Sequence, residues 1–163
     1  MIEIEGLKKR FGQSIALDEV SMHVRDGAMY GFVGPNGAGK TTTIRCMMGL
    51  LAADGGKLLI NGINMEKEPK KALSQIGYIP DDFGVYDNLK VLEYMEFFAS
   101  CYGITGLSAR KRSMTLLDQV GLEGKSDFYV DSLSKGMKQR LCLARALVHN
   151  PSILIMDEPT AGL

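Results

Sequence analysis

The chain has no tryptophan, only three cysteines and no long hydrophobic run among its 163 residues. Cys46, Cys101 and Cys142 are odd in number and far apart, which excludes a disulfide framework and a CxxC metal pair and fits a reducing cytosol. No uncharged apolar run reaches the ~18 residues of a membrane-spanning helix, and residues 1–9 lack a secretory signal pattern. If the protein works at a membrane, another polypeptide or another segment must supply the spans.

An excess of charge of either sign is also absent. Lys and Arg together number 19, as do Asp and Glu, so the formal net charge is zero. This balance gives no general attraction to nucleic acid or to an anionic membrane. The short basic runs at residues 8–10 and 110–112 are more typical of solvated faces than of a nucleic-acid site, so we expect no nucleic-acid partner.

Hydrophobic patterning predicts strands separated by helices within one globular domain. Residues 20–24 alternate as a strand with one buried face should. The continuous apolar runs at residues 29–33 and 153–156 predict strands buried on both faces, which is typical of a parallel sheet. Gly55-Gly56 is expected to break the chain between elements. The expected strands are residues 2–7, 20–24, 29–33, 58–60, 76–79 and 153–156.

Helical spacing of apolar residues predicts four helices. The first runs from Lys40 to about Leu50, and a second carries a stripe from Val91 to Tyr102. Ser108 predicts the N-cap of a third helix that ends at Gly121, and Ser134 predicts the N-cap of a fourth that ends at residues 150–151. The stripe of the second helix consists of Val91, Tyr94, Met95, Phe98, Cys101 and Tyr102.

Residues 34–41 match the phosphate-loop pattern G-x-x-x-x-G-K-[ST] at every defined position, between a predicted strand and a predicted helix. Glycines allow the backbone N–H groups to turn inward around phosphate oxygens, and the helix start adds its dipole. Lys40 is predicted to reach the β- and γ-phosphates, and the Thr41 hydroxyl to bind Mg²⁺. The predicted nucleotide-binding residues here are Gly34, Pro35, Asn36, Gly37, Ala38, Gly39, Lys40, Thr41 and Thr42.

The apolar run at residues 153–156 is followed by two acids, Asp157 and Glu158. Adjacent residues of a strand point to opposite faces, so the two carboxylates would have separate roles. Asp157 is suited to bind Mg²⁺, and Glu158 to polarise the water that attacks the γ-phosphate. The loop and these acids together predict a P-loop NTPase, without indicating which family.

Residues 133–140 read Leu-Ser-Lys-Gly-Met-Lys-Gln-Arg and resemble the LSGGQ signature of ATP-binding-cassette proteins with its usual Gln-Arg continuation. Lys135 replaces the first glycine and Met137 the usual Gln, whereas Ser134 and Gly136 are present.

Other segments follow the order of the same family across the chain. Phe11 occupies the place of the aromatic residue that stacks on adenine. Residues 76–80 resemble the stretch that enters the Q-loop, and residues 161–163 resemble the start of the D-loop. On these motifs the chain is identified as a member of the ATP-binding-cassette family, of the exporter-like kind.

The resemblance implies an α/β fold: a P-loop NTPase core with a mainly parallel sheet, a small antiparallel β subdomain and a helical insertion. Residues 1–163 would form a single domain, truncated at its C-terminus, with the nucleotide-binding core at 1–80 and 134–163. The helical subdomain would cover about residues 81–133.

The resemblance also implies ATP and Mg²⁺ as ligands and a second nucleotide-binding domain, identical or not, as a head-to-tail partner. An integral membrane permease would be the other partner and would hold the protein at the cytoplasmic face of the cell membrane. A helix N-terminus bearing Ser and Gly is well suited to cap a γ-phosphate. The signature residues expected to meet ATP in trans are Leu133, Ser134, Gly136 and Gln139.

The chain departs from the family at the Q-loop, where Asp81 follows Pro80 in place of Gln. We expect Asp81, or Asp82 beside it, to sense the metal; the alternative is a loop with two solvated acids. The sequence also ends before the D-loop Asp and the family's later His, and neither His23 nor His149 is expected to substitute. We therefore expect this chain to bind nucleotide but to hydrolyse ATP poorly.

Three functions remain open from the sequence: the motor of an exporter, the ATPase of an importer, and a non-transport ATPase acting on ribosomes or DNA. The threonines at 41–43 and residues 81–98 resemble exporter cassettes. Leu92 and Phe97 lie outside the main helical stripe and would suit a groove for a permease helix. Packing within the subdomain is the alternative for both side chains.

Overall fold

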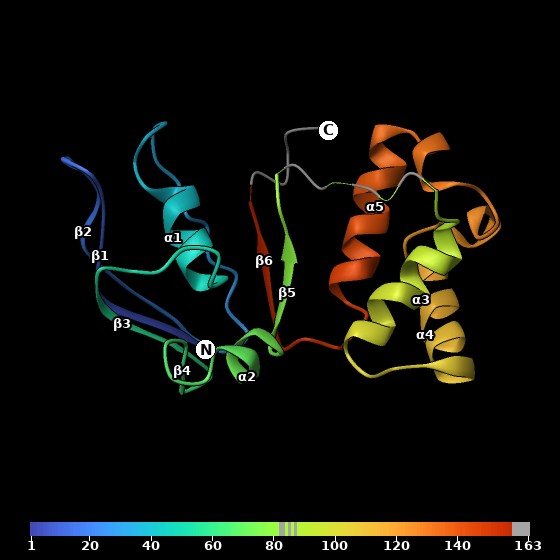
Figure 1. Ribbon diagram of the computed structural model, residues 1–163, viewed down its shortest axis with the longest axis horizontal. Helices are drawn as coiled ribbons and strands as arrows, with labels where there is room; N and C mark the ends of the chain where they lie inside the picture. The colour runs from blue at the N-terminus through green and yellow to red at the C-terminus, as the bar shows by residue number, and fades with distance from the viewer. Residues whose placement is uncertain (82–83, 85, 87, 158–163) are drawn as a thin grey trace. The chain divides into compact units, whose positions relative to one another are not determined.

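The computed structural model describes every residue except 82, 83, 85, 87 and 158–163, and it divides into two compact units, residues 1–76 and 77–163. No helix in the described parts of the chain is both long and apolar enough to cross a membrane. The described helices and strands (Figure 1) are β1 (Ile2–Phe11), β2 (Ser14–Val24), α1 (Lys40–Met47), β3 (Gly55–Ile60), β4 (Ile63–Asn64), α2 (Pro69–Leu73), β5 (Ile76–Ile79), α3 (Val91–Cys101), α4 (Gly106–Gln119), α5 (Lys135–Ala146) and β6 (Ile153–Met156), with short 3₁₀ turns at Glu123–Lys125 and Val130–Ser132.

The first unit is built on an antiparallel sheet with strand order β2-β1-β3-β4. The predicted strands at residues 2–7, 20–24 and 58–60 are confirmed, because alternating apolar side chains cover one face. Ile4, Leu7, Leu17 and Ile60 are buried, and α1 adds buried side chains from residues 43–47. The β1–β2 hairpin turns at residues 12–13, where Gly12 takes a positive φ of 58°.

The expected chain break at Gly55-Gly56 is wrong, because both residues belong to β3. Gly56 has a φ of 94°, and a Cβ built on it would lie 2.6 Å from the Leu7 Cα. Strand β1 therefore passes too close to β3 for any side chain at this point. The glycine permits a close backbone approach within the sheet.

The buried central strand expected at residues 29–33 is also not observed. No strand is assigned there, and the Met29 and Val33 side chains are almost fully exposed. A buried strand needs neighbours on both edges to pair its N–H and C=O groups. Neither described sheet contains a strand beside this segment, so the apolar run stays irregular.

The second unit is centred on α3, α4 and α5, which lie side by side in Figure 1. The predicted stripe is confirmed at Val91, Tyr94 and Met95, which are fully buried in a cluster that α4 and α5 complete. It is wrong at Cys101 and Tyr102, which are exposed because α3 ends at Cys101.

A guanidinium links α5 to α3 within this core. Arg145 Nη1 donates to the Tyr94 hydroxyl at 3.0 Å, and the Arg145 guanidinium lies 5.1 Å from the Phe98 ring centroid. Burial raises the pKa of Tyr94, with the charge of Arg145 opposing the shift. The Tyr94 phenol therefore stays neutral, and its oxygen accepts the hydrogen bond from Arg145.

Helix α4 begins earlier than the sequence predicts. Thr105 is extended and its carbonyl accepts from Ala109 N–H at 3.4 Å, so Ser108 lies inside the helix and is not its N-cap. The prediction for the other end is confirmed: Gly121 takes a φ of 66°, and Leu122 N–H reaches back to the Leu117 carbonyl at 2.7 Å.

Strands β5 and β6 form a two-stranded sheet and run in the same direction in Figure 1. Asp157 N–H donates to the Ile79 carbonyl at 2.9 Å, so the pairing extends to the ends of both strands. The predicted strands are confirmed, but burial on both faces is not: Ile155 is buried, whereas Leu154 and Met156 are exposed. A sheet of two strands leaves one face uncovered among the residues described.

Leu117→Ala should lower the free energy of unfolding by about 2–5 kcal/mol, because it removes a fully buried side chain from the three-helix core. Leu107→Ala on the same helix, where the side chain is 86% exposed, should change it by less than about 0.5 kcal/mol. Urea unfolding followed by circular dichroism measures both variants. Equal losses would contradict the assigned core.

Candidate functional site

The phosphate-loop sequence forms a tight backbone turn that leads into α1. Gly37 and Gly39 take positive φ values of 81° and 86°, and Ala38 N–H donates to the Pro35 carbonyl at 3.2 Å. A Cβ on Gly39 would lie 2.6 Å from Leu17 Cδ2 and 2.8 Å from the Ala16 carbonyl oxygen on β2. Glycine at position 39 is thus required both by its conformation and by its contact with the sheet.

The N-terminus of α1 is electropositive. The first N–H groups of a helix have no partner within it, and the first turn of α1 contains no acidic residue. Lys40 Nζ donates to the Gly34 carbonyl at 2.5 Å and to the Pro35 carbonyl at 2.8 Å, so the ammonium lies against the loop. Thr41 and Thr42 are half-buried in the same turn. This donor set fits the phosphates of a nucleotide.

Two polar contacts join the loop to its helix. The Thr43 hydroxyl and the Thr43 N–H both donate to the Gly39 carbonyl, at 2.9 Å and 2.8 Å. Thr43 is fully buried, so its role is to hold the loop and not to meet a ligand. Sequence spacing places Thr43 near the loop but does not distinguish it from Thr41 and Thr42.

Phe11, predicted to stack on adenine, ends β1 opposite Ser14. Its ring is 51% exposed and has the Lys9 ammonium 5.8 Å from its centroid. An exposed aromatic ring at a strand end offers a flat surface to a base. Phe11 and the phosphate loop belong to the same compact unit, in which Gly39 contacts β2, the hairpin partner of β1.

The predicted acidic residues lie in the second unit. Asp157 directly follows β6 and is only 6% exposed, and Asp81 is exposed two residues after β5 ends. Because β5 and β6 are paired and run in the same direction, the two acids follow the same edge of this sheet. Carboxylate oxygens are a ligand type that Mg²⁺ prefers. Glu158 and Asp82 lie outside the described residues.

The signature segment forms the start of α5, as predicted. The Ser134 hydroxyl accepts from Met137 N–H at 3.3 Å, which confirms Ser134 as the N-cap. Leu133 is buried in the helical core, Gly136 is exposed and Gln139 is half-buried. The first turn of α5 contains no acidic residue, so the helix dipole at this surface is not offset.

Comparison with known proteins gives a consistent assignment. The profile of a family described as ABC transporter matches residues 17–161. The linearmycin resistance ATP-binding protein LnrL of Bacillus subtilis is 37% identical over all of this chain, which covers 52% of that protein. The Nod factor export ATP-binding protein I of Ralstonia nicotianae is 39% identical over all of this chain, which covers 51% of that protein. The chain thus spans about half the length of these curated relatives.

A solved structure supports the fold. The structure of cbiO1 from Clostridium perfringens, described as part of the ABC transporter complex cbiONQ, has a TM-score of 0.87 and 29% identity. The match covers 99% of this chain and 66% of that one. The α/β fold class expected from the motifs is confirmed by this likeness. The individual nucleotide, metal and signature residues remain predictions.

Gly39→Ala should lower the free energy of unfolding by about 2–5 kcal/mol, since the methyl group adds crowding against β2 to the cost of left-handed backbone. Gly37→Ala is the matched control: its φ is similar, but no atom lies within 4 Å of the added carbon. Its cost should be about 1–2 kcal/mol. Chemical denaturation measures both, and a larger loss for Gly37→Ala would refute this account of the loop.

Proposed function

This chain belongs to the ABC transporter family, and we propose that it is the ATP-binding subunit of a membrane exporter. It would couple ATP binding and hydrolysis to substrate export. The observation that carries the proposal is the phosphate loop: a glycine turn held against β2, with the Lys40 ammonium against it and the N-terminus of α1 behind it. The names of the relatives, one a resistance protein and one an export protein, support the exporter role.

ATP would bind with its phosphates at the loop formed by residues 34–39. Backbone N–H groups and the start of α1 would donate to phosphate oxygens, and Lys40 would exchange its loop carbonyls for the β- and γ-phosphates. Thr42 would add a donor in the first turn. The exposed Phe11 ring would stack on the adenine.

Mg²⁺ would be held by the Thr41 hydroxyl and by Asp157, with Asp81 as a further carboxylate at the same sheet edge. The half-buried Thr41 and the buried Asp157 supply oxygen ligands of suitable chemistry. When bound, the metal neutralises charge on the β- and γ-phosphates.

Glu158 would be the general base. It follows Asp157 directly in the sequence. Asp157 would then be left to the metal while Glu158 accepts a proton from the attacking water.

A second nucleotide-binding domain would complete the site from the other side. The N-terminus of α5 presents Ser134 and Gly136 at the surface, with lysines at 135 and 138 and no acid in its first turn. Such a helix start attracts an anion, and a γ-phosphate of the partner's ATP is the proposed occupant. Leu133 anchors this segment in the core, and Gln139 lies one turn further along.

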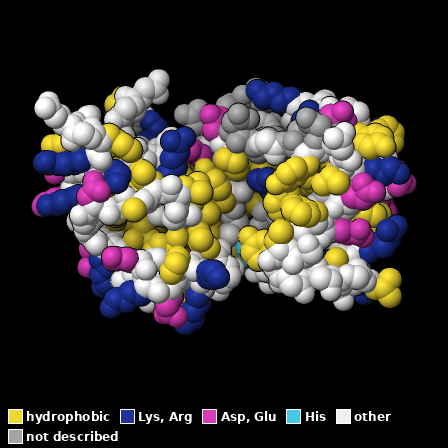
Figure 2. Space-filling view, in the orientation of Figure 1, with side chains coloured by type: hydrophobic (Ala, Val, Ile, Leu, Met, Phe, Trp, Pro, Cys, Tyr) yellow, Lys and Arg dark blue, Asp and Glu magenta, His cyan; other side chains and the backbone are white. Residues whose placement is uncertain are grey.

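A permease is the proposed membrane partner, and it would hold the protein at the cytoplasmic face of the cell membrane. The docking surface we propose is aromatic: Phe97 and Tyr86 are exposed, and their ring centroids lie 5.6 Å apart. In the view of Figure 2, hydrophobic side chains gather over α3 and α5. Leu92, also expected in this groove, is buried and packs within the helical core instead.

The division of the chain into a core at 1–80 and 134–163 with a helical subdomain at about 81–133 remains a proposal. The division assigns α5 to the nucleotide-binding core, and α5 also packs against α3 and α4 in the helical cluster.

Lys40→Ala should abolish ATP binding, whereas Glu158→Gln, made in a full-length version of the protein, should keep ATP affinity and lower hydrolysis by about 10²–10⁴-fold, the usual contribution of a general base. Isothermal titration measures the affinity, and phosphate release measures the turnover.

Lys57→Ala is the matched control for the lysine, because Lys57 is an exposed residue of β3 in the same unit. It should leave ATP affinity unchanged. Full ATP affinity in Lys40→Ala would overturn the proposed loop function, and unchanged turnover in Glu158→Gln would remove Glu158 from the role of base.

Phe97→Ser should weaken binding to the proposed permease subunit by more than about tenfold, as expected for an exposed aromatic anchor. Phe128→Ser is the control, because Phe128 is equally exposed (47% against 46%) but packs under Lys125. Titration with the detergent-solubilised subunit measures both affinities. Equal effects of the two changes would argue against the aromatic docking surface.

A further inference from the structure

Asp54 joins the end of β1 to the segment that follows α1. Its Oδ2 accepts from the Arg10 backbone N–H at 2.7 Å, and its Oδ1 accepts from Lys9 Nζ at 2.9 Å. The same ammonium donates to the Ala52 carbonyl at 2.6 Å. One carboxylate therefore binds the two residues that directly precede Phe11.

This contact begins where the pairing of β1 with β3 ends. The last matched pair is Lys8 with Gly55, and Asp54 N–H donates to the Lys8 carbonyl at 2.9 Å. Beyond that point the Arg10 N–H is bonded by the Asp54 side chain in place of a strand. On the other edge, the register of β1 with β2 shifts on both sides of Lys9. The Asp54 carboxylate thus fixes the end of β1, where the pairing with β3 has stopped and the pairing with β2 is out of regular register.

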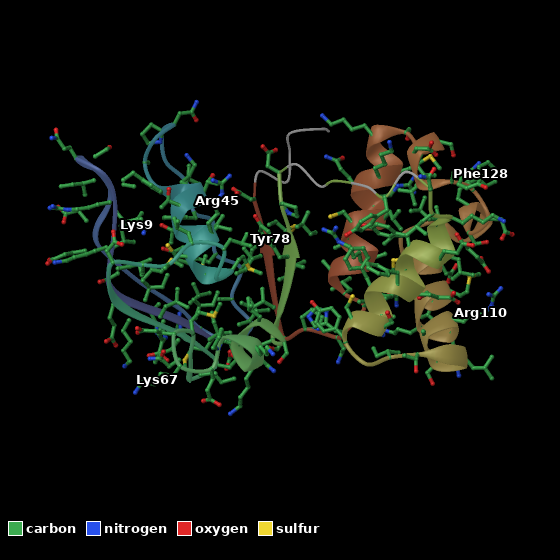
Figure 3. All side chains as sticks on the ribbon, in the orientation of Figure 1. Lys9, Arg45, Lys67, Tyr78, Arg110 and Phe128 are labelled. Atoms are coloured by element: carbon green, nitrogen blue, oxygen red, sulfur yellow. The ribbon has the colours of Figure 1, made fainter. Side chains whose placement is uncertain are left out.

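The segment that carries Asp54 is tied to α1. Leu50 N–H and Leu51 N–H both donate to the Arg45 carbonyl, at 2.9 Å and 3.2 Å, so the chain stays bound to the helix beyond its last turn. Figure 3 labels Lys9 on β1 and Arg45 on α1 within this unit. Helix α1 starts at the phosphate loop, so Asp54 connects the proposed base-binding residue with the proposed phosphate-binding element.

The Lys9 ammonium contacts both the Asp54 carboxylate and the Phe11 ring. The Lys9 side chain is only 12% exposed, and its ammonium lies on one side of the Phe11 ring while about half of the ring stays open. The hydrogen bond from Lys9, followed by that from the Arg10 N–H, lowers the pKa of the Asp54 carboxyl, so the carboxylate is charged at neutral pH.

We propose that Asp54 is a positioning residue for adenine: by holding Lys9 and Arg10, it sets the Phe11 ring at a fixed distance from the phosphate loop. A nucleotide can then use the ring and the loop together without first ordering the strand end. This inference rests on the proposed function, in which Phe11 stacks on the base.

The test compares ATP with inorganic tripolyphosphate, which meets the loop but has no base, by isothermal titration of the protein. Phe11→Ala should weaken ATP by about tenfold, as the loss of one base–aromatic stack does. Asp54→Ala should weaken ATP by about fivefold and leave tripolyphosphate affinity unchanged, because the ring is present but no longer held. Asp54→Asn, which keeps an acceptor for the Arg10 N–H, should lie between Asp54→Ala and the parent protein.

Two further variants sharpen the comparison. In the double variant Phe11→Ala with Asp54→Ala, ATP affinity should equal that of Phe11→Ala alone, because Asp54 acts through the ring. Asp26→Ala is the matched control: Asp26 is an exposed aspartate of the same unit that pairs with the chain's amino group. It should leave both affinities unchanged.

The outcomes separate this inference from the proposed function. If Phe11→Ala leaves ATP affinity unchanged, the base-stacking part of the proposed function is wrong and the inference fails with it. If Phe11→Ala weakens ATP but Asp54→Ala does not, only the inference is overturned. Equal weakening of ATP and tripolyphosphate by Asp54→Ala would show a general structural role and also overturn it. Should Asp54→Ala unfold, Asp54→Asn decides by the same comparison.

Discussion

The contact of Gly39 with β2 is the constraint on which the candidate site depends. A backbone with positive φ turns the chain into α1 at the same residue where the Ala16 carbonyl and the Leu17 side chain leave no room for a Cβ. The loop is thereby fixed against the antiparallel sheet, and Thr43 bonds the Gly39 carbonyl from the helix side. Geometry at one glycine thus sets where the electropositive helix start points.

Both helices that begin at predicted ligand-binding segments share an electrostatic feature. The first turns of α1 and α5 contain lysine and no acid, although acids there would stabilise the helices themselves by about 0.3–1 kcal/mol each. Packing supplies that stability instead: Ile44 and Met47 of α1 are buried, as are Leu141 and Ala144 of α5. The helix ends remain free to attract anions because their other faces are anchored in hydrophobic cores.

Local signals in the sequence predicted the parts of the fold that local chemistry determines. The cap at Ser134, the stop at Gly121 and the alternating strands are confirmed, since each depends on a few neighbouring residues. The predicted strand at residues 29–33 was wrong because an apolar run becomes a strand only where neighbouring strands pair with it. The prediction of Ser108 as an N-cap was wrong because Thr105, which is also able to begin a helix, lies three residues earlier.

The candidate site shows the same division. The loop motif predicted the glycine turn and the electropositive helix start, but Asp54 carries no signal, because its partners lie more than forty positions away in the chain. Helical periodicity put Leu92 outside the main stripe, but it does not reveal that the Leu92 side chain is buried in the cluster that α3 forms with α4 and α5.

The exposed run at residues 29–33 also bears on how the protein behaves in concentrated solution. It contains two aromatic residues and a β-branched one, with no charge and no proline, which is the composition of segments that pair edge to edge. The chain has zero formal net charge, so there is no net electrostatic repulsion between copies of it to oppose association. Self-association would therefore start at this short stretch of backbone.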